Sequence, residues 1–259
     1  MKYKLKVISI QEIGKRPNQE DSIYPLLGVA TDDDRVFVLC DGMGGHERGE
    51  LASNAVCMTI GDYLHDKPFT ENEFLNALNL AFEELDKIEV AANDKKKPGT
   101  TMTFLGFYDK GAFIAHIGDS RVYHIRPSKH QILFQTKDHS LVNQLLDLGE
   151  ITPKEAKLSP IKNVISRAML SNQNPRPKVD IYKTTDIKNG DYFLMCSDGM
   201  LEQITDDNII NIISLKDKSD ENKAEILRKV TDNNNDNHSA HLIHVLKVIK
   251  RYRLPWNSY

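Results

Sequence analysis

Apolar residues in the first half of the chain come in short runs that glycine, aspartate or proline interrupts. This is the pattern of antiparallel strands joined by turns. The runs predict strands over residues 23–30, 36–40, 101–108, 112–117, 122–125 and 131–135. Alternating charged and apolar residues over 1–8 are typical of an edge strand.

Two stretches between the second and third of these strands have helical spacing instead. After Thr70, apolar residues recur at alternating gaps of four and three, and Glu73 stands where a capping box needs it. One face of this helix would hold Phe74, Leu78, Ala81, Leu85 and Ile88. A second helix is predicted over 49–64, with a face of Ala52, Val56, Ile60 and Leu64.

The pattern of residues changes over 140–177, where it predicts only short helical segments. Thr152, Pro153 and Glu155 combine a cap, a proline at the first helical position and a glutamate at the third. We interpret this segment as a flap. Strands at 179–183 and 192–196, a helix at 224–230 and a strand at 240–249 follow. Crossover helices with antiparallel hairpins indicate an α+β fold, in which two sheets pack face to face and helices cover them.

Composition narrows the class of protein. The chain is 40% hydrophobic and 27% charged with a net charge of -3, so it has no basic field for nucleic acid. No segment approaches the roughly 20 apolar residues that span a bilayer. Three cysteines in apolar runs, Cys40, Cys57 and Cys196, predict buried thiols. We therefore expect a cytoplasmic protein that binds neither nucleic acid nor membrane.

Four aspartates stand at the ends of apolar runs: Asp41, Asp119, Asp198 and Asp236. Each alone is an ordinary turn residue. Strand ends collect at one edge of packed sheets, however, and converging carboxylates repel unless protons or a hard cation neutralise them. Oxygen ligands without a cysteine or histidine cluster favour Mg²⁺ or Mn²⁺ over Zn²⁺.

Arg16 adds a possible phosphate ligand, because a guanidinium can hold two phosphate oxygens at once. Glu20 and Asp21 follow it closely. The residues alone leave two interpretations of Arg16 open, a phosphate ligand or an exposed arginine before the turn at Pro17.

Motifs along nearly the whole chain resemble, in order, those of the metal-dependent protein phosphatase family, also called the protein phosphatase 2C family. They are RPNQED at 16–21, DGMGGH at 41–46, GE at 49–50 with AS at 52–53, GTT at 99–101, GDSRVY at 118–123, DHSLV at 138–142 with GEIT at 149–152, SDG at 197–199 and DN at 236–237. Met43 and the flap sequence resemble the bacterial branch.

The resemblance implies one catalytic domain over 1–250, a four-layer sandwich of two central antiparallel sheets flanked by helices, with a flap at about 138–177 and a tail at 251–259. It also implies two Mn²⁺ or Mg²⁺ ions and room for a third. Asp41 would bridge both ions and act in catalysis with Arg16, which would grip the phosphate. The implied ligand set is Asp21, Asp41, the Gly42 carbonyl, Asp119 for the third ion, Asp198 and Asp236, with Glu20 and Asn237 supporting it.

The function implied by the resemblance is hydrolysis of phosphoserine and phosphothreonine in proteins, by direct attack of a water that bridges the two ions. The partners would be phosphorylated targets of a serine/threonine kinase, and we expect a monomer active in signalling. The alternative is a catalytically silent binding or scaffolding module. The complete set of carboxylates argues against it, because such a module is free to lose residues that repel one another.

Some positions depart from the pattern of the family. Met43 replaces the histidine that protonates the leaving group in many relatives, and a thioether cannot donate a proton. His46 is a candidate for that role, although a structural histidine is the more ordinary interpretation, as it is for His116 and His139. His241 and His244 in the last strand suggest a polar or partly exposed face.

Overall fold

The computed structural model describes residues 2–43, 48–88, 97–161 and 164–249. Two antiparallel sheets form its centre. One sheet has five strands in the spatial order β1-β12-β11-β7-β8. The other has seven: six lie in the spatial order β10-β6-β5-β3-β4-β9, and the seventh, β2, pairs with β3. These strands are β1 (Lys2–Glu12), β2 (Asp21–Tyr24), β3 (Val36–Met43), β4 (Gly99–Thr100), β5 (Met102–Tyr108), β6 (Gly111–Ile117), β7 (Arg121–Arg126), β8 (Gln131–Gln135), β9 (Met169–Leu170), β10 (Asp180–Thr184), β11 (Tyr192–Cys196) and β12 (His238–Ile249).

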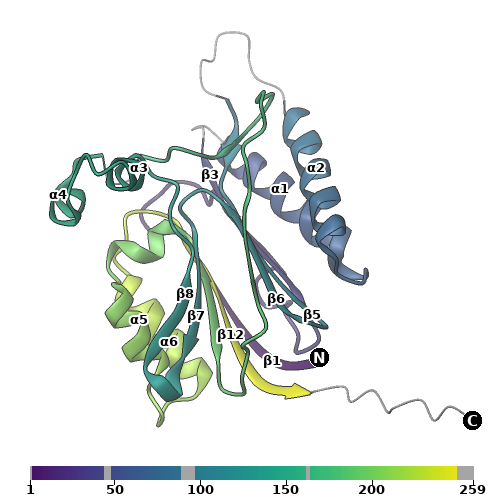
Figure 1. The fold of residues 1–259 in the computed structure, drawn as a ribbon, viewed down its shortest axis with the longest axis vertical. Helices are drawn as coiled ribbons and strands as arrows, with labels where there is room; N and C mark the ends of the chain where they lie inside the picture. The colour runs from purple at the N-terminus through teal and green to yellow at the C-terminus, as the bar shows by residue number, and fades with distance from the viewer. Residues whose placement is uncertain (1, 44–47, 89–96, 162–163, 250–259) are drawn as a thin grey trace, which may run out of the picture.

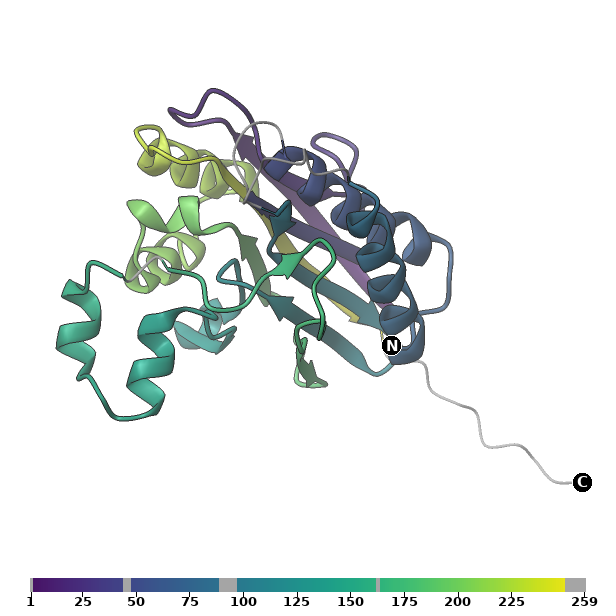
Figure 2. The same ribbon diagram turned by 90° about the horizontal axis from the view of Figure 1, so that it is seen from above.

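Helices cover the outer face of each sheet, which gives four layers (Figure 1). Helices α1 and α2 lie on the seven-stranded sheet, and α5 and α6 lie on the five-stranded one. Two short helices, α3 and α4, protrude at the flap (Figure 2). The helices are α1 (Arg48–His65), α2 (Glu71–Asp86), α3 (Leu141–Asp147), α4 (Pro153–Leu158), α5 (Asp206–Ile213) and α6 (Asp220–Thr231), with 3₁₀ turns η1 (Pro127–Lys129) and η2 (Asp198–Glu202).

Strand β3 shows how side-chain alternation builds these layers. Val36, Val38 and Cys40 pack under α1 and α2, whereas Phe37 and Leu39 enter the core between the sheets. Successive side chains of a strand point to opposite faces, so Asp41 continues the row that faces the other sheet. Strand β11 alternates in the same way, with Phe193 and Met195 between the sheets.

The strongest sequence patterns are confirmed. The five-residue face predicted for α2 is buried except for Ile88, which is partly buried and packs against the same core. Thr70 caps α2 by accepting from the Glu73 N–H, but the Glu73 carboxylate accepts from Tyr63 instead of closing the capping box. Both halves of the box form at Thr152 and Glu155. The three cysteines are buried and free.

Other expectations were wrong. The strand expected over 23–30 ends at Tyr24, because Pro25 lacks an N–H to donate and Gly28 has a positive φ of 74°. Helix α5 was missed, since its isoleucine-rich run has no long helical period. His241 lies fully buried between the sheets, where it bonds the Ser9 hydroxyl at 2.9 Å, so it marks no exposed face.

We expect Phe74→Ala to lower the free energy of unfolding by about 3–5 kcal/mol, the usual cost of truncating a buried phenylalanine. Phe74 is fully buried and its ring lies 4.7 Å from that of Phe104 and 5.1 Å from that of Phe113. Urea denaturation measures the change. Leu80→Ala on the same helix is the control and should cost below about 1 kcal/mol, because Leu80 is 36% exposed. Equal losses would contradict this account of the core.

Candidate metal and phosphate site

The pairing of β2 with β3 places Asp21 directly opposite Asp41. The backbone of Asp41 is held firmly. Its N–H donates to the Thr101 hydroxyl at 2.9 Å, and its carbonyl accepts from the Thr101 N–H at 2.8 Å and from the Thr100 hydroxyl at 2.9 Å. Two of the acidic side chains are therefore fixed by strand register, which places them at the edge of the sheets where β3 ends.

Asp198 reaches the same place from the other sheet. It follows β11 and opens η2, and its carboxyl lies within hydrogen-bond reach of the Asp41 carboxyl. Burial raises the pKa of Asp41, and the neighbouring charges of Asp21, Asp198 and Asp119 raise it further. Burial also raises the pKa of Asp198. Two carboxyls this close cannot both be ionised unless a cation neutralises them; without a cation, one of them keeps its proton.

Asp21 and Asp119 are buried on either side of this pair. Burial raises the pKa of Asp21 to about 7 and that of Asp119 to about 8, with Asp198 adding to both. One oxygen of each, Asp21 Oδ1 and Asp119 Oδ1, is buried without a hydrogen-bond partner among the residues that the structure describes. Such orphaned oxygens are costly in a protein interior.

Ser197 supports the cluster, a role that its place in the SDG motif did not predict. Its hydroxyl donates to Asp21 Oδ2 at 2.8 Å and accepts from the Ser239 N–H at 3.0 Å. It thereby links Asp21 to β12. The sequence did contain a usable clue, because Ser197 continues the inward-facing row of Phe193 and Met195.

Two glycines permit the backbone to close in around the cluster. A Cβ on Gly42 would stand 2.1 Å from the Gly49 carbonyl oxygen and 2.6 Å from that of Glu20. A Cβ on Gly199 would stand 1.9 Å from the Asn237 carbonyl oxygen. Neither position has room for a side chain.

Asp236 lies nearer to solvent and pairs with Arg16, at 2.7 Å from its Nη2. The Arg16 side chain is 55% exposed and that of Asp236 is 33% exposed. The resemblance gives these two residues separate roles, whereas here the guanidinium lies on the carboxylate. This ion pair joins the expected phosphate ligand to the expected metal ligand.

Asn237 fastens the segment that carries Arg16 and Glu20. Its side-chain oxygen accepts from the Glu20 N–H at 2.8 Å, and its amide donates to the carbonyls of Ile13 at 2.8 Å and Asn18 at 2.9 Å. The Glu20 carboxylate lies beside Gly49 in the first turn of α1, and burial raises its pKa. The structure therefore brings together every residue of the predicted site.

The cluster suits a hard divalent cation. Its donors are carboxylates and backbone carbonyls, two of their oxygens lack partners within the described part of the chain, and burial together with neighbouring charges raises the pKa values of Asp21 and Asp119. Mg²⁺ and Mn²⁺ prefer such oxygen ligands. The cluster therefore fits such a cation in the type of its ligand atoms and in its negative charge.

A second group of ligand-type residues, His116, His139 and Asp180, is a poorer metal site. His139 Nδ1 accepts from the Gly118 N–H at 3.0 Å, which leaves its other nitrogen to donate to Asp180 at 3.1 Å. Arg167 already bonds Asp180 at 2.8 Å. Because both nitrogens of His139 have partners and the Arg167 guanidinium lies on Asp180 and 3.0 Å from His139 Nε2, we interpret this group as structural.

Residues 13–247 match the family model described as protein phosphatase 2C. The chain belongs to the protein phosphatase 2C family. It is 34% identical to the protein phosphatase PhpP of Streptococcus pneumoniae over 218 residues. This aligned region covers 81% of this chain and 85% of that relative. This confirms the predicted enzyme class, a protein serine/threonine phosphatase of bacterial type.

Solved structures confirm the α+β fold of this phosphatase. The Mycobacterium tuberculosis serine/threonine phosphatase PstP/Ppp superposes with a TM-score of 0.79 at 29% identity, covering 93% of this chain and 98% of that one. The catalytic domain of PstP in complex with two manganese ions superposes with a TM-score of 0.75 at 28% identity, covering 94% and 99%. A relative of this phosphatase thus binds two manganese ions.

The general acid stays unassigned. Met43 lies against Gly99, with its Cγ 3.3 Å from where a Cβ on that glycine would be. His46, like Gly44 and Gly45, lies outside the described residues.

The metal-free phosphatase should lose stability as the pH rises from 6.5 to 8. Above pH 6.5 the unfolded chain has already ionised Asp21 and Asp119, whereas the fold keeps them protonated up to about pH 7 and 8. Each carboxyl that the fold keeps protonated costs about 1.4 kcal/mol per pH unit. Burial lowers the pKa values of His116, His139 and His241, which are neutral in the fold; in the unfolded chain they are partly protonated at pH 6.5 and neutral by pH 8, so they offset part of the loss only near the lower limit.

Thermal unfolding in chelator, followed across this pH range, measures the slope. Asp21→Asn should flatten it, and Mn²⁺ should raise the midpoint more at pH 8 than at pH 6.5. A stability that rises with pH over the same interval would refute the charge account of the cluster.

Proposed function

We propose that this phosphatase hydrolyses phosphoserine and phosphothreonine in proteins, with two divalent ions held by the acidic cluster. The observation that carries the proposal is the meeting of Asp41 and Asp198 from opposite sheets, with Asp21 beside them. When bound, two such ions supply a water of near-neutral pKa and stabilise charge on the phosphoryl oxygens.

We assign the residues as follows. Asp41 would serve both ions, with the Gly42 carbonyl at one of them. Asp198 and Asp236 would hold the other, and Asp21 would join directly or through water. Asp119 would hold a third ion. The buried, backbone-fixed position of Asp41 suits a bridging ligand, because it needs no rearrangement to present its oxygens.

Arg16 is the proposed phosphate ligand and acts in catalysis. Its guanidinium is exposed and paired with one carboxylate, so a bound phosphate can take over some of its donors. Asn237 holds this segment through its hydrogen bonds, and Glu20 would hold a water at the metal site. Ser197 keeps Asp21 oriented. No serine or cysteine nucleophile is needed.

The silent binding module remains the alternative. It predicts a fold that holds no divalent ion, and calorimetric titration with Mn²⁺ separates it from the enzyme. Saturable binding that Asp41→Asn abolishes supports the enzyme, and heat changes equal to the buffer blank support the module.

The biological setting is also a proposal. Substrates of this class of phosphatase are phosphoproteins, and we infer that the targets of a serine/threonine kinase are among them. None of the helices in the described ranges is long and apolar enough to cross a bilayer. We retain the cytoplasmic, monomeric interpretation with no nucleic-acid partner, and a single domain over 1–250, which the pairing of β1 with β12 supports. The tail at 251–259 lies outside the described residues.

Asp41→Asn should lower kcat by about a thousandfold, since it weakens the charge that holds both ions. The assay measures phosphate release from a phosphothreonine peptide and from p-nitrophenyl phosphate, with Mn²⁺ or with chelator. Asp62→Asn is the matched control, because Asp62 is exposed on α1, and it should retain full activity. Release that ignores both metal and Asp41→Asn would overturn the proposal.

Arg16→Ala should lower kcat/KM by about a hundredfold through loss of phosphate contacts, and Arg16→Lys should fall between, because lysine cannot hold two oxygens with one planar group. Arg228→Ala, which removes a 38% exposed arginine of α6, controls for the loss of charge. Wild-type kcat/KM in Arg16→Ala would show that Arg16 only pairs with Asp236.

A further inference from the structure

The flap hinge is bonded to the loop that carries Asp119. Gly118, one residue before Asp119, accepts from the His139 N–H at 3.0 Å and donates to His139 Nδ1 at 3.0 Å. Arg121, two residues after it, binds Asp138. Two consecutive flap residues, Asp138 and His139, are therefore bonded to the residues on either side of Asp119.

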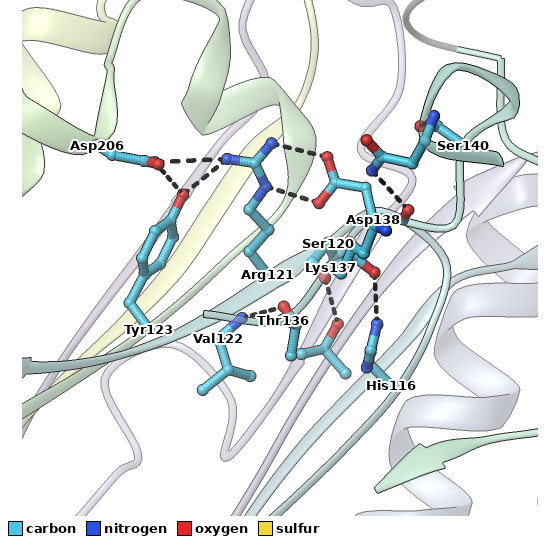
Figure 3. A network of polar contacts seen from close by, with 12 residues as sticks. His116, Ser120, Arg121, Val122, Tyr123, Thr136, Lys137, Asp138, Ser140 and Asp206 are labelled. Atoms are coloured by element: carbon cyan, nitrogen blue, oxygen red, sulfur yellow. Dashed lines mark hydrogen bonds and ion pairs between the residues drawn. The ribbon is translucent and has the colours of Figure 1, made fainter. Parts of the chain in front are cut away.

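Arg121 makes the stronger of these attachments. Its Nε and Nη2 each lie 2.7 Å from one oxygen of the Asp138 carboxylate, a bidentate ion pair (Figure 3). Its side chain is 24% exposed and that of Asp138 is 19% exposed. Charge-assisted bidentate pairs in such shielded positions fix geometry as well as charge.

The third nitrogen of Arg121 ties the same side chain to the body of the protein. Nη1 donates to the Tyr123 hydroxyl at 2.9 Å and lies 3.5 Å from Asp206 at the start of α5. The Tyr123 hydroxyl donates to Asp206 at 2.9 Å. The Arg121 guanidinium thus binds the flap through Nε and Nη2 and the start of α5 through Nη1.

The two ends of the flap are joined to each other at the same hinge. Ser140 bridges to Ile165, the Leu141 N–H donates to the Val164 carbonyl at 2.9 Å, and the Ser166 N–H donates to the His139 carbonyl at 2.7 Å. These contacts tie residues 139–141 at one end of the flap to residues 164–166 at the other. Asp138 is at the base of the flap.

Several apolar side chains of the flap are exposed to solvent. Four large apolar side chains between the hinge ends are exposed: Leu141 at 37%, Leu148 at 71%, Leu158 at 78% and Val164 at 41%. Exposed apolar side chains on a projecting segment are available for contact with another protein. Helices α3 and α4 project from the body of the molecule at the end where β3 is labelled (Figure 1).

We propose that Arg121 is a positioning residue for protein substrates, because its grip on Asp138 sets where the flap lies relative to the Asp119 loop. The inference rests on the proposed function. It makes Arg121 act through the flap and not on the reacting phosphate. Loss of the grip should therefore weaken recognition of a phosphoprotein and spare the hydrolysis of a small phosphate ester.

Arg121→Lys and Asp138→Asn test the contact with the flap, and Asp206→Asn is the matched control for the contact of the same arginine with α5. For a phosphorylated protein substrate, we expect the first two to raise KM about tenfold, the scale of a small misplacement. With p-nitrophenyl phosphate, kcat and KM should stay within about twofold of wild type, as should all constants of Asp206→Asn. The double variant should be no worse than either single one, because both break one ion pair.

Trypsin cleavage at Lys154 in α4 gives a readout without catalysis. Cleavage should be faster in Arg121→Lys and Asp138→Asn than in wild type and in Asp206→Asn, at temperatures well below unfolding. Unchanged KM for the phosphoprotein, equal effects of Asp206→Asn, or a parallel loss on p-nitrophenyl phosphate would each overturn the proposal.

A wild-type protein inactive on both substrates would overturn the proposed function, and with it the role of Arg121 in substrate binding. The trypsin comparison would still show whether the ion pair holds the hinge. Should Arg121→Lys unfold, Asp138→Asn breaks the same pair from the flap side and decides the result.

Discussion

Repulsion between carboxylates that share one pocket is the constraint on which this structure depends. Asp41 and Asp198 come from opposite sheets and meet within hydrogen-bond reach, with Asp21 and Asp119 buried beside them. Burial and mutual charge raise their pKa values, so the folded chain holds these groups only with protons or cations. Such a site favours the binding of divalent ions, because a bound cation removes the repulsion between carboxylates that the fold forces together.

The site divides into a rigid part and an adjustable part. Strand register, Thr101 and Ser197 fix the buried aspartates, and the glycines let the backbone close around them. Arg16 and Asp236 lie at the rim, exposed and paired with each other. This division suits phosphoryl transfer, in which positioning and charge do most of the catalysis. Bound ions require fixed ligands, and in the proposed function Arg16 would exchange its contact with Asp236 for the phosphate.

The Asp119 loop links the acidic cluster to the flap. Asp119 is buried and feels the charge of Asp198, while Gly118 and Arg121 on either side of it are bonded to the base of the flap. Variation in the flap can therefore change the choice of phosphoprotein without disturbing the buried aspartates, provided that the hinge contacts persist. The family likeness of the fold and the individuality of substrates are compatible for this reason.

Sequence by itself determined the elements whose patterns are local and long. The buried face of α2, the alternation of β3 and the caps at Thr70 and Thr152 follow from spacing alone, and the aspartates at strand ends identify the site. Tertiary structure alone decided which distant groups touch. It paired Arg16 with Asp236, gave Ser197 to Asp21, buried His241 and joined Arg121 to the flap. The reason is physical: side-chain period depends on neighbours in the chain, whereas strand register and the approach of two sheets depend on contacts between residues far apart in it.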